Sequence, residues 1–174
     1  MISRKEKGFS LIELLIVVAI ILIISAIAIP NLIRARIAAN QASAAQSLRT
    51  LDSAATAYSN TYQDGYPANL GVMAPPGGAA SCNAAGMIDA ELATAQKAGY
   101  TFTWVVGNDQ VANPPAGCPP GYTDMFSVTA APFGFPTGTT YYCVDATGVI
   151  RQSPAPIVAT TAGCPAGAMP IGNQ

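Results

Sequence analysis

Histidine is absent from the 174 residues of this chain, and charged side chains make up only 10% of them. Without histidine the chain lacks the commonest general base and zinc ligand, and Ser–His and Cys–His catalytic pairs are excluded. A phosphate-binding G-x-x-x-x-G-K-[ST] loop is missing too, so we expect no nucleotide hydrolysis through that motif. The net charge of −1 leaves no basic patch for nucleic acid. These absences argue against an enzyme and against a nucleic-acid-binding protein.

The four cysteines are Cys82, Cys118, Cys143 and Cys164, and none forms a C-x-x-C pair. An even number at wide spacing indicates two disulfides rather than a metal site. Disulfides form in oxidising compartments, so this part of the chain is expected outside the cytoplasm. Three pairings are possible, and local loop closure favours Cys82–Cys118 and Cys143–Cys164.

Residues 9–29 form an apolar run of 21 residues with a single charge, Glu13. As a helix this run is about 31 Å long, enough to cross a hydrocarbon core of about 30 Å. The leader before it, MISRKEKG, carries three basic residues and one acidic residue. Basic flanks stay in the cytoplasm, which predicts a single-pass protein with its N-terminus inside and its cysteines outside.

Three interpretations of this run compete, and they differ in what they make of Glu13. One is a plain membrane anchor. Another is a secretory signal peptide with an A-x-A site at residues 26–28, although the apolar stretch is longer than usual for that class. The third starts from the cost of a carboxylate in lipid, up to a few kcal/mol, which is normally offset by a partner. A cut between Gly8 and Phe9 creates an amine four residues before Glu13, on the same face of a helix. In lipid the two charges can then neutralise one another within a chain or between packed chains.

The stretch GFSLIELLIVV, from residue 8 to residue 18, closely resembles the N-terminal motif of type IV pilins and of type II secretion pseudopilins. The resemblance implies that a prepilin peptidase cuts after Gly8, that Phe9 becomes the methylated N-terminus, and that Glu13 is the assembly carboxylate. Pro30 matches a helix-bending proline of that family, and a bend or a melted segment is expected there. The motif is specific but covers only the first part of the chain.

Beyond Pro30 the sequence predicts an amphipathic helix, so that one long helix runs from about residue 9 to about residue 62. Its apolar positions recur every three or four residues, with one polar exception. They are Ile33, Ile37, Gln41, Ala44, Leu48, Leu51, Ala55, Tyr58 and Tyr62. Gly65 and Pro67 are stop signals for this helix.

The remaining residues predict a small α+β head. Residues 63–87 look like a loop, followed by a short helix with Asp89 as its N-cap, Leu92 and Ala95 on its inner face and Gly99 as its stop. Alternating β-prone residues predict strands at 100–106 and 125–130 and a hairpin of 139–145 with 149–151. We therefore expect an antiparallel sheet of three or four strands packed on the amphipathic half-helix.

The expected organisation is a cleaved leader (1–8), a transmembrane or filament-core half-helix (9–29), an amphipathic half-helix (30–62) and a disulfide-bonded head (63–174). By resemblance this is the type IV pilin fold. Major pseudopilins often bind calcium in a head loop. Here Asp89, Glu91 and Asp145 are scattered, so the sequence leaves a calcium site open without supporting it, and no other metal or cofactor is expected.

The resemblance implies a structural pilin subunit, stored in the inner membrane of a bacterium and then polymerised into a helical homopolymer on the cell surface. Its expected partners are copies of itself, the prepilin peptidase, and an assembly platform with its ATPase. Two other roles are open at this point. The chain could be a type II secretion pseudopilin, or a minor or adhesive pilin at a filament tip. A membrane-anchored enzyme is disfavoured by the missing catalytic groups.

Overall fold

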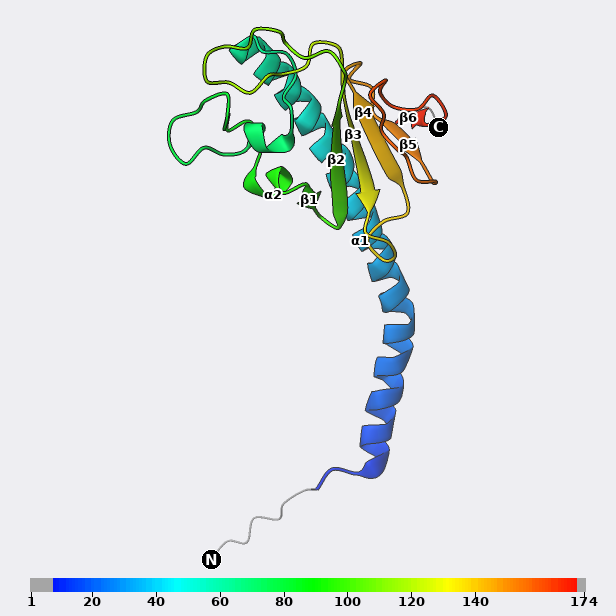
Figure 1. Cartoon of the computed structure of the whole chain (residues 1–174). Helices are drawn as coiled ribbons and strands as arrows, with labels where there is room; N and C mark the ends of the chain where they lie inside the picture. Colours follow the sequence, from blue (N-terminus) through cyan, green and yellow to red (C-terminus); the bar gives the residue numbers. More distant parts are fainter. Residues whose placement is uncertain (1–7, 172–174) are drawn as a thin grey trace, which may run out of the picture. The chain divides into compact units, whose positions relative to one another are not determined.

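The computed structural model describes residues 8–171, which form two units: residues 8–36 and residues 37–171, called the head unit below. Of the expected leader, residues 1–7 lie outside the described residues. Figure 1 shows the order of the elements along the chain. They are α1 (Leu11–Tyr62), η1 (Leu70–Met73), α2 (Ala90–Ala93), β1 (Gln96–Lys97), β2 (Tyr100–Val106), β3 (Phe126–Pro132), β4 (Tyr141–Asp145), β5 (Arg151–Ser153) and β6 (Met169–Pro170). The α+β class expected from the sequence is confirmed.

Helix α1 ends at Tyr62 because the next residues leave the helical conformation. Gln63 and Gly65 both have positive φ angles, of 53° and 70°, which is the left-handed region where helices commonly stop. The stop expected around Gly65 is therefore confirmed. The helical assignment continues through Pro30, so the alternative of a melted segment there is wrong. The bend at Pro30 stays a prediction.

Within the head unit, one face of α1 forms the centre of the core. Ala44, Leu48, Leu51, Ala55 and Tyr58 are all at most 1% exposed, so this part of the predicted apolar stripe is confirmed. The Tyr58 hydroxyl donates a hydrogen bond of 2.8 Å to the carbonyl of Cys82. Burial, together with the nearby charge of Asp64 and the phenol of Tyr62, raises the pKa of Tyr58 to about 12, so this donor keeps its proton at neutral pH.

The sheet has six strands in the order β1-β2-β3-β4-β5-β6, and every neighbouring pair is antiparallel. The expected number of three or four was too low because β1 and β6 have two residues each, too few to show a periodicity. The long strands lie close to their predicted positions. Strand β2 coincides with the predicted range, and β3 and β4 begin one and two residues late.

Two short helical segments also differ from expectation. Asp89 caps α2 as predicted, accepting a hydrogen bond of 2.8 Å from the Leu92 amide. The helix nevertheless ends at Ala93, because Ala95 has a φ of 62° and the chain then enters β1. A 3-10 helix, η1, interrupts the predicted loop and is capped by the side chain of Asn69.

The two faces of the sheet are covered differently. On the inner face, Phe102, Phe126 and Val128 pack with α1 in the main hydrophobic cluster. Successive side chains of a strand point to opposite faces, so Ser127 and Thr129 point to the outer face. They are nevertheless only 0% and 6% exposed. They are covered by the segment 154–168, called the cover below, which contributes Ile157 and Ala168 to a second cluster with Cys143. Three layers therefore lie across the middle of the head unit: α1, the sheet and the cover.

Gly121 is a position where we predict a large loss of stability. A Cβ added to Gly121 would overlap the backbone carbonyl of Asp64 and lie 2.9 Å from that of Tyr66. Gly121→Ala is therefore expected to lower the free energy of unfolding by about 1–3 kcal/mol, the usual cost of overpacking. Urea unfolding of the detergent-solubilised chain measures this. Gly78→Ala is the matched control, because no heavy atom lies within 4 Å of its added Cβ. Equal midpoints for the two variants would contradict the close packing.

Candidate assembly site

The motif residues lie at the start of α1. Gly8, Phe9 and Ser10 precede the helix, which begins at Leu11, two residues later than expected. Phe9 is 84% exposed. In this chain, which still carries residues 1–8, Phe9 is therefore not part of the helix. The one-turn relation expected between the Phe9 amine and Glu13 after cleavage stays a prediction.

Glu13 is held by the first turn of α1. Its Oε2 accepts a hydrogen bond of 2.9 Å from the backbone N–H of Ser10, the residue before the helix. The Ser10 carbonyl in turn accepts a bond of 3.3 Å from the Leu14 amide. A glutamate in the third helical position that reaches back to the N-cap amide is half of a capping box. Its negative charge also lies at the positive end of the helix dipole.

Sequence reasoning missed this capping role, although the pattern Ser-x-x-Glu before an apolar run signals it. The bond uses one carboxylate oxygen, so Oε1 is left for a second donor. Glu13 thus has a local structural reason for its position, in addition to the partner expected from the cost of a charge in lipid. The two roles are separable, because a neutral glutamine can also cap a helix.

The rest of the first unit is an apolar surface. Within residues 8–171 one helix, α1, is long and apolar enough to cross a membrane, and its apolar window is not buried by other parts of the chain. Every large apolar side chain from Phe9 to Ile29 is exposed, between 47% for Val18 and 84% for Phe9. A surface this apolar needs lipid or other protein around it. The chain therefore has a membrane-spanning or helix-packing segment with one carboxylate at its start.

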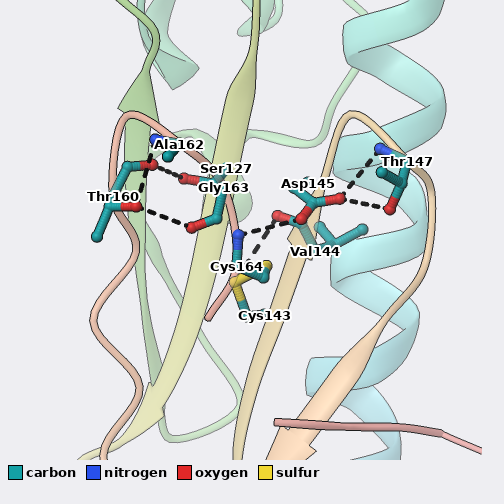
Figure 2. The surroundings of a disulfide bond; sticks show 9 residues. All are labelled: Ser127, Cys143, Val144, Asp145, Thr147, Thr160, Ala162, Gly163 and Cys164. Atoms are coloured by element: carbon teal, nitrogen blue, oxygen red, sulfur yellow. Dashed lines mark hydrogen bonds between the residues drawn. A yellow bond between two sulfur atoms is a disulfide. The ribbon is translucent and has the colours of Figure 1, made fainter. Parts of the chain in front are cut away.

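Both disulfides are formed, in the pairs that local loop closure favoured. Cys82 is joined to Cys118, and Cys143 to Cys164. The first links the loop after η1 to the loop before β3, and beside it the Asn83 side chain donates a bond of 2.8 Å to the carbonyl of Gly117. The second joins β4 to the cover (Figure 2). Each of the two disulfides therefore fixes a segment that contains little regular secondary structure.

Asp145, at the end of β4, holds the cover and the β4–β5 turn together, as Figure 2 shows. Its carboxylate accepts a bond of 3.0 Å from the Cys164 amide, and bonds from the amide and hydroxyl of Thr147. Burial opposes its charge, but the bonds from Thr147 and Cys164 and the charge of Arg151 prevail and lower the pKa of Asp145. The sequence placed Asp145 at the end of a predicted hairpin strand and did not indicate these bonds.

The pKa of Asp52, in α1, shifts in the opposite direction to the pKa of Asp145. Burial, and then the negative charge of Asp145, raise the pKa of Asp52 above its ordinary value. A carboxylate whose folded pKa is raised costs stability at neutral pH, and one whose folded pKa is lowered contributes stability there. The two residues therefore have opposite effects on the pH dependence of the head unit.

We expect Asp145→Asn to lower the free energy of unfolding by about 1.5–3 kcal/mol at pH 7, the range for hydrogen bonds to a charged group. Because the folded pKa lies below the ordinary value of 3.8, this contribution is present above that value and is lost as pH falls through the folded pKa. Denaturation at pH 7 and near pH 2 measures the difference. Asp52→Asn is the matched control and should be neutral or stabilising at pH 7. A deficit of Asp145→Asn that is the same at both pH values would contradict the charge-based account.

Chemistry other than assembly has little support in the described part of the chain. Residues 8–171 contain no group of three or more His, Cys, Asp or Glu side chains placed to hold a metal ion. Two hollows of the head unit, of about 420 and 340 Å³, are lined mainly by Ala, Ser, Thr, Gln, Gly and Met. Neither contains a pair of groups suited to nucleophilic or acid–base catalysis.

The start of the chain is similar in sequence to known proteins. Residues 3–29 match the family described as the prokaryotic N-terminal methylation motif. A further match is to the type IV wide pilus major component PilA4 of Thermus thermophilus, which is 65% identical over 37 residues. Both findings support the type IV pilin and pseudopilin family. The resemblance read from residues 8–18 is thereby confirmed.

These matches concern a limited part of the chain. The similarity to PilA4 covers 21% of this chain and 28% of the relative. No solved structure matches the chain. The matches therefore concern the start of the chain and its apolar helix, and none of them covers the head unit.

Proposed function

We propose that this chain is the structural subunit of a type IV pilus-like filament. The observation that carries the proposal is the methylation motif of residues 3–29, which spans the start of an exposed apolar helix with Glu13 capping its first turn. PilA4, whose matched segment is 65% identical, is named as a major component of a type IV wide pilus. The proposed role is structural rather than catalytic.

In the proposed pathway the subunit is first stored in the inner membrane with its N-terminus inside and its head outside. The basic leader and the two disulfides of the head support this orientation. A prepilin peptidase then cuts after Gly8 and methylates the new amine of Phe9. An assembly platform and its ATPase, supplied by other chains, extract the subunit into the growing filament.

Assembly is proposed to depend on two parts of residues 9–29. The exposed apolar side chains pack against those of neighbouring helices, and each large one that becomes fully buried contributes about 1.5–3 kcal/mol. Glu13 supplies the register, because Oε1 can accept from the Phe9 amine of an adjacent chain while Oε2 retains the Ser10 amide. A carboxylate and an amine at fixed positions neutralise each other only at one axial offset between parallel helices.

The intact mass of the protein in material sheared from the cell surface tests this proposal. The expected species begins at a monomethylated Phe9, has both disulfides closed and is abundant in that fraction. Gly8→Trp is the control, because a bulky residue at the cut site should leave the full leader attached and remove the chain from the sheared material. A processed wild-type chain found only in membranes would contradict a filament subunit and would favour a pseudopilin. An uncut wild-type chain would contradict the proposal and leave a plain membrane anchor as the remaining interpretation of residues 9–29.

A further inference from the structure

The loop of residues 133–140, between β3 and β4, presents two phenylalanines to solvent. Phe133 is 58% exposed and Phe135 is 78% exposed. The other phenylalanines of the head unit, Phe102 and Phe126, are only 2% and 1% exposed. Proteins rarely leave neighbouring aromatic rings in water without a contact that uses them. This loop is therefore a candidate interaction surface.

The backbone of the loop is fixed by hydrogen bonds within the head unit. Phe133 donates its amide to the carbonyl of Gly99 at 3.0 Å, and Thr137 donates its amide to that of Gly134 at 2.7 Å. The hydroxyl of Tyr100 donates to the carbonyl of Thr140 at 2.9 Å. A loop that is already ordered loses little conformational entropy when it binds. The two phenyl rings are thus presented on a preformed support.

The loop lies at the base of the head unit, defined as the end where α1 enters it at residue 37 (Figure 1). Asn40 donates its side-chain amide to the carbonyl of Thr137 at 2.9 Å. Gln41 donates to the hydroxyls of Thr139 and Thr140 at 3.1 and 3.2 Å. The exposed rings are therefore attached to the first turns of α1 in the head unit.

The chemistry of the loop fits the boundary between lipid head groups and acyl chains. No residue from 131 to 142 is charged, and the flanking side chains are proline, glycine and threonine. Trp and Tyr concentrate at this boundary, Phe occurs with Trp and Leu on the apolar face of segments that lie in it, and apolar surface buried there strengthens binding. We propose that Phe133 and Phe135 insert into the interfacial layer of the membrane while the subunit is stored there. This inference rests on the proposed storage of the subunit by residues 9–29.

Chain length permits this contact. Asn40 is eleven residues after Ile29, so helix rise separates it from the end of the apolar run by at most about 16 Å. Phe135 is two residues from Thr137, which adds a reach of about 7 Å. The interfacial layer is about 5–7 Å thick on each side of the hydrocarbon core. At a helix tilt of about 40°, the upper end of the observed range, the 16 Å falls to about 12 Å along the membrane normal. The reach of about 7 Å then brings the loop to about 5 Å from the hydrocarbon core, which is inside the interfacial layer but outside the middle of the membrane.

The test uses the full precursor reconstituted into vesicles of phosphatidylethanolamine and phosphatidylglycerol whose acyl chains are brominated near the head groups. A tryptophan introduced by Phe135→Trp reports the contact through quenching. Val158→Trp is the matched control, because Val158 is 75% exposed but lies two residues from Thr160. Thr160 is bonded to Ser127 at 3.0 Å, toward the end of β3 opposite the 133–140 loop. The native Trp104 gives the same background in both variants.

We expect Phe135→Trp to show a blue-shifted emission and to lose more than about half of its added fluorescence to the bromines. The tryptophan of Val158→Trp should not be quenched by the bromines, so that this variant shows the same quenching as the unsubstituted chain. Quenching of Phe135→Trp no greater than that of Val158→Trp would overturn the inference while leaving the proposed function intact. Protection of the introduced tryptophan only in sheared filaments would also overturn it, since the contact would then be with another copy. A precursor that does not float with the vesicles would refute membrane storage, and the inference with it.

Discussion

Glu13→Leu is expected to leave the precursor in the membrane but to reduce surface filaments by more than about tenfold. The substitution makes the apolar run more hydrophobic, so insertion is not impaired. It removes the partner of the Phe9 amine, and leaving one member of a desolvated ion pair without the other costs about 3–5 kcal/mol. The amount of this protein in the sheared fraction, measured against its total amount in the cells, gives the ratio. Wild-type amounts of normal filaments from this variant would refute the register role of Glu13.

Glu13→Gln separates the capping bond that the structure shows for this side chain from its proposed role in setting the register. Glutamine can still accept the Ser10 amide bond that Glu13 makes at 2.9 Å, so the capping of α1 is retained. It carries no charge for the Phe9 amine. If charge pairing matters for assembly, the glutamine variant should be as defective as the leucine variant. Full assembly by the glutamine variant would assign Glu13 to capping alone.

The second large effect is expected from opening the disulfide of the cover. Cys143→Ala combined with Cys164→Ala removes a bond that spans 21 residues of sequence. Loop-closure entropy predicts a loss of about 3 kcal/mol for a loop of this size. Without that bond the cover is held against the sheet by a small cluster around Ile157 and Ala168 and by two hydrogen bonds, from the Cys164 amide to Asp145 and from the Ser127 hydroxyl to the carbonyl of Thr160. We therefore expect it to detach before the rest of the head unit unfolds.

Limited proteolysis and thermal unfolding of the oxidised chain measure this effect. The double-alanine variant should be cut within residues 154–168 under conditions that leave the wild type intact, and its Tm should fall. Cys82→Ala combined with Cys118→Ala is the matched control, because its bond spans 36 residues in another part of the head unit. That variant should unfold earlier but should not be cut preferentially in the cover. Equal protection of the cover in both variants would contradict the proposed role of Cys143–Cys164.

The parts of the fold that could be predicted were those in which apolar residues recur at a regular spacing. The stripe from Ala44 to Tyr58 repeats every three or four residues and is buried as a continuous face of α1. Strand β2, Tyr100–Val106, alternates over seven residues and was placed correctly. Strands β1 and β6 were missed because two residues contain no period, and they exist only because a longer strand offers them an edge.

In the candidate site, local chemistry could be read from the sequence but long-range contacts could not. The spacing of Gly8, Phe9 and Glu13 carries the methylation motif, which the comparison supports. The bond between Asp145 and the Cys164 amide joins residues 19 apart through a tail without periodicity. The cover was unpredictable for the same reason. Its position depends on a disulfide and on the small apolar side chains of a segment rich in proline, alanine and glycine.

The strand order of the sheet has a consequence for how the head is made. Each strand from β2 to β6 pairs with the strand that precedes it in the chain, so no later strand has to be inserted between two earlier ones. A domain with this connectivity can be built by successive additions while the polypeptide is still being translocated. The core helix α1, which lies first in the chain, is available as a template from the beginning. In the proposed export of the head, translocation and folding can therefore proceed in the same direction, with formation of the Cys143–Cys164 disulfide among the last steps.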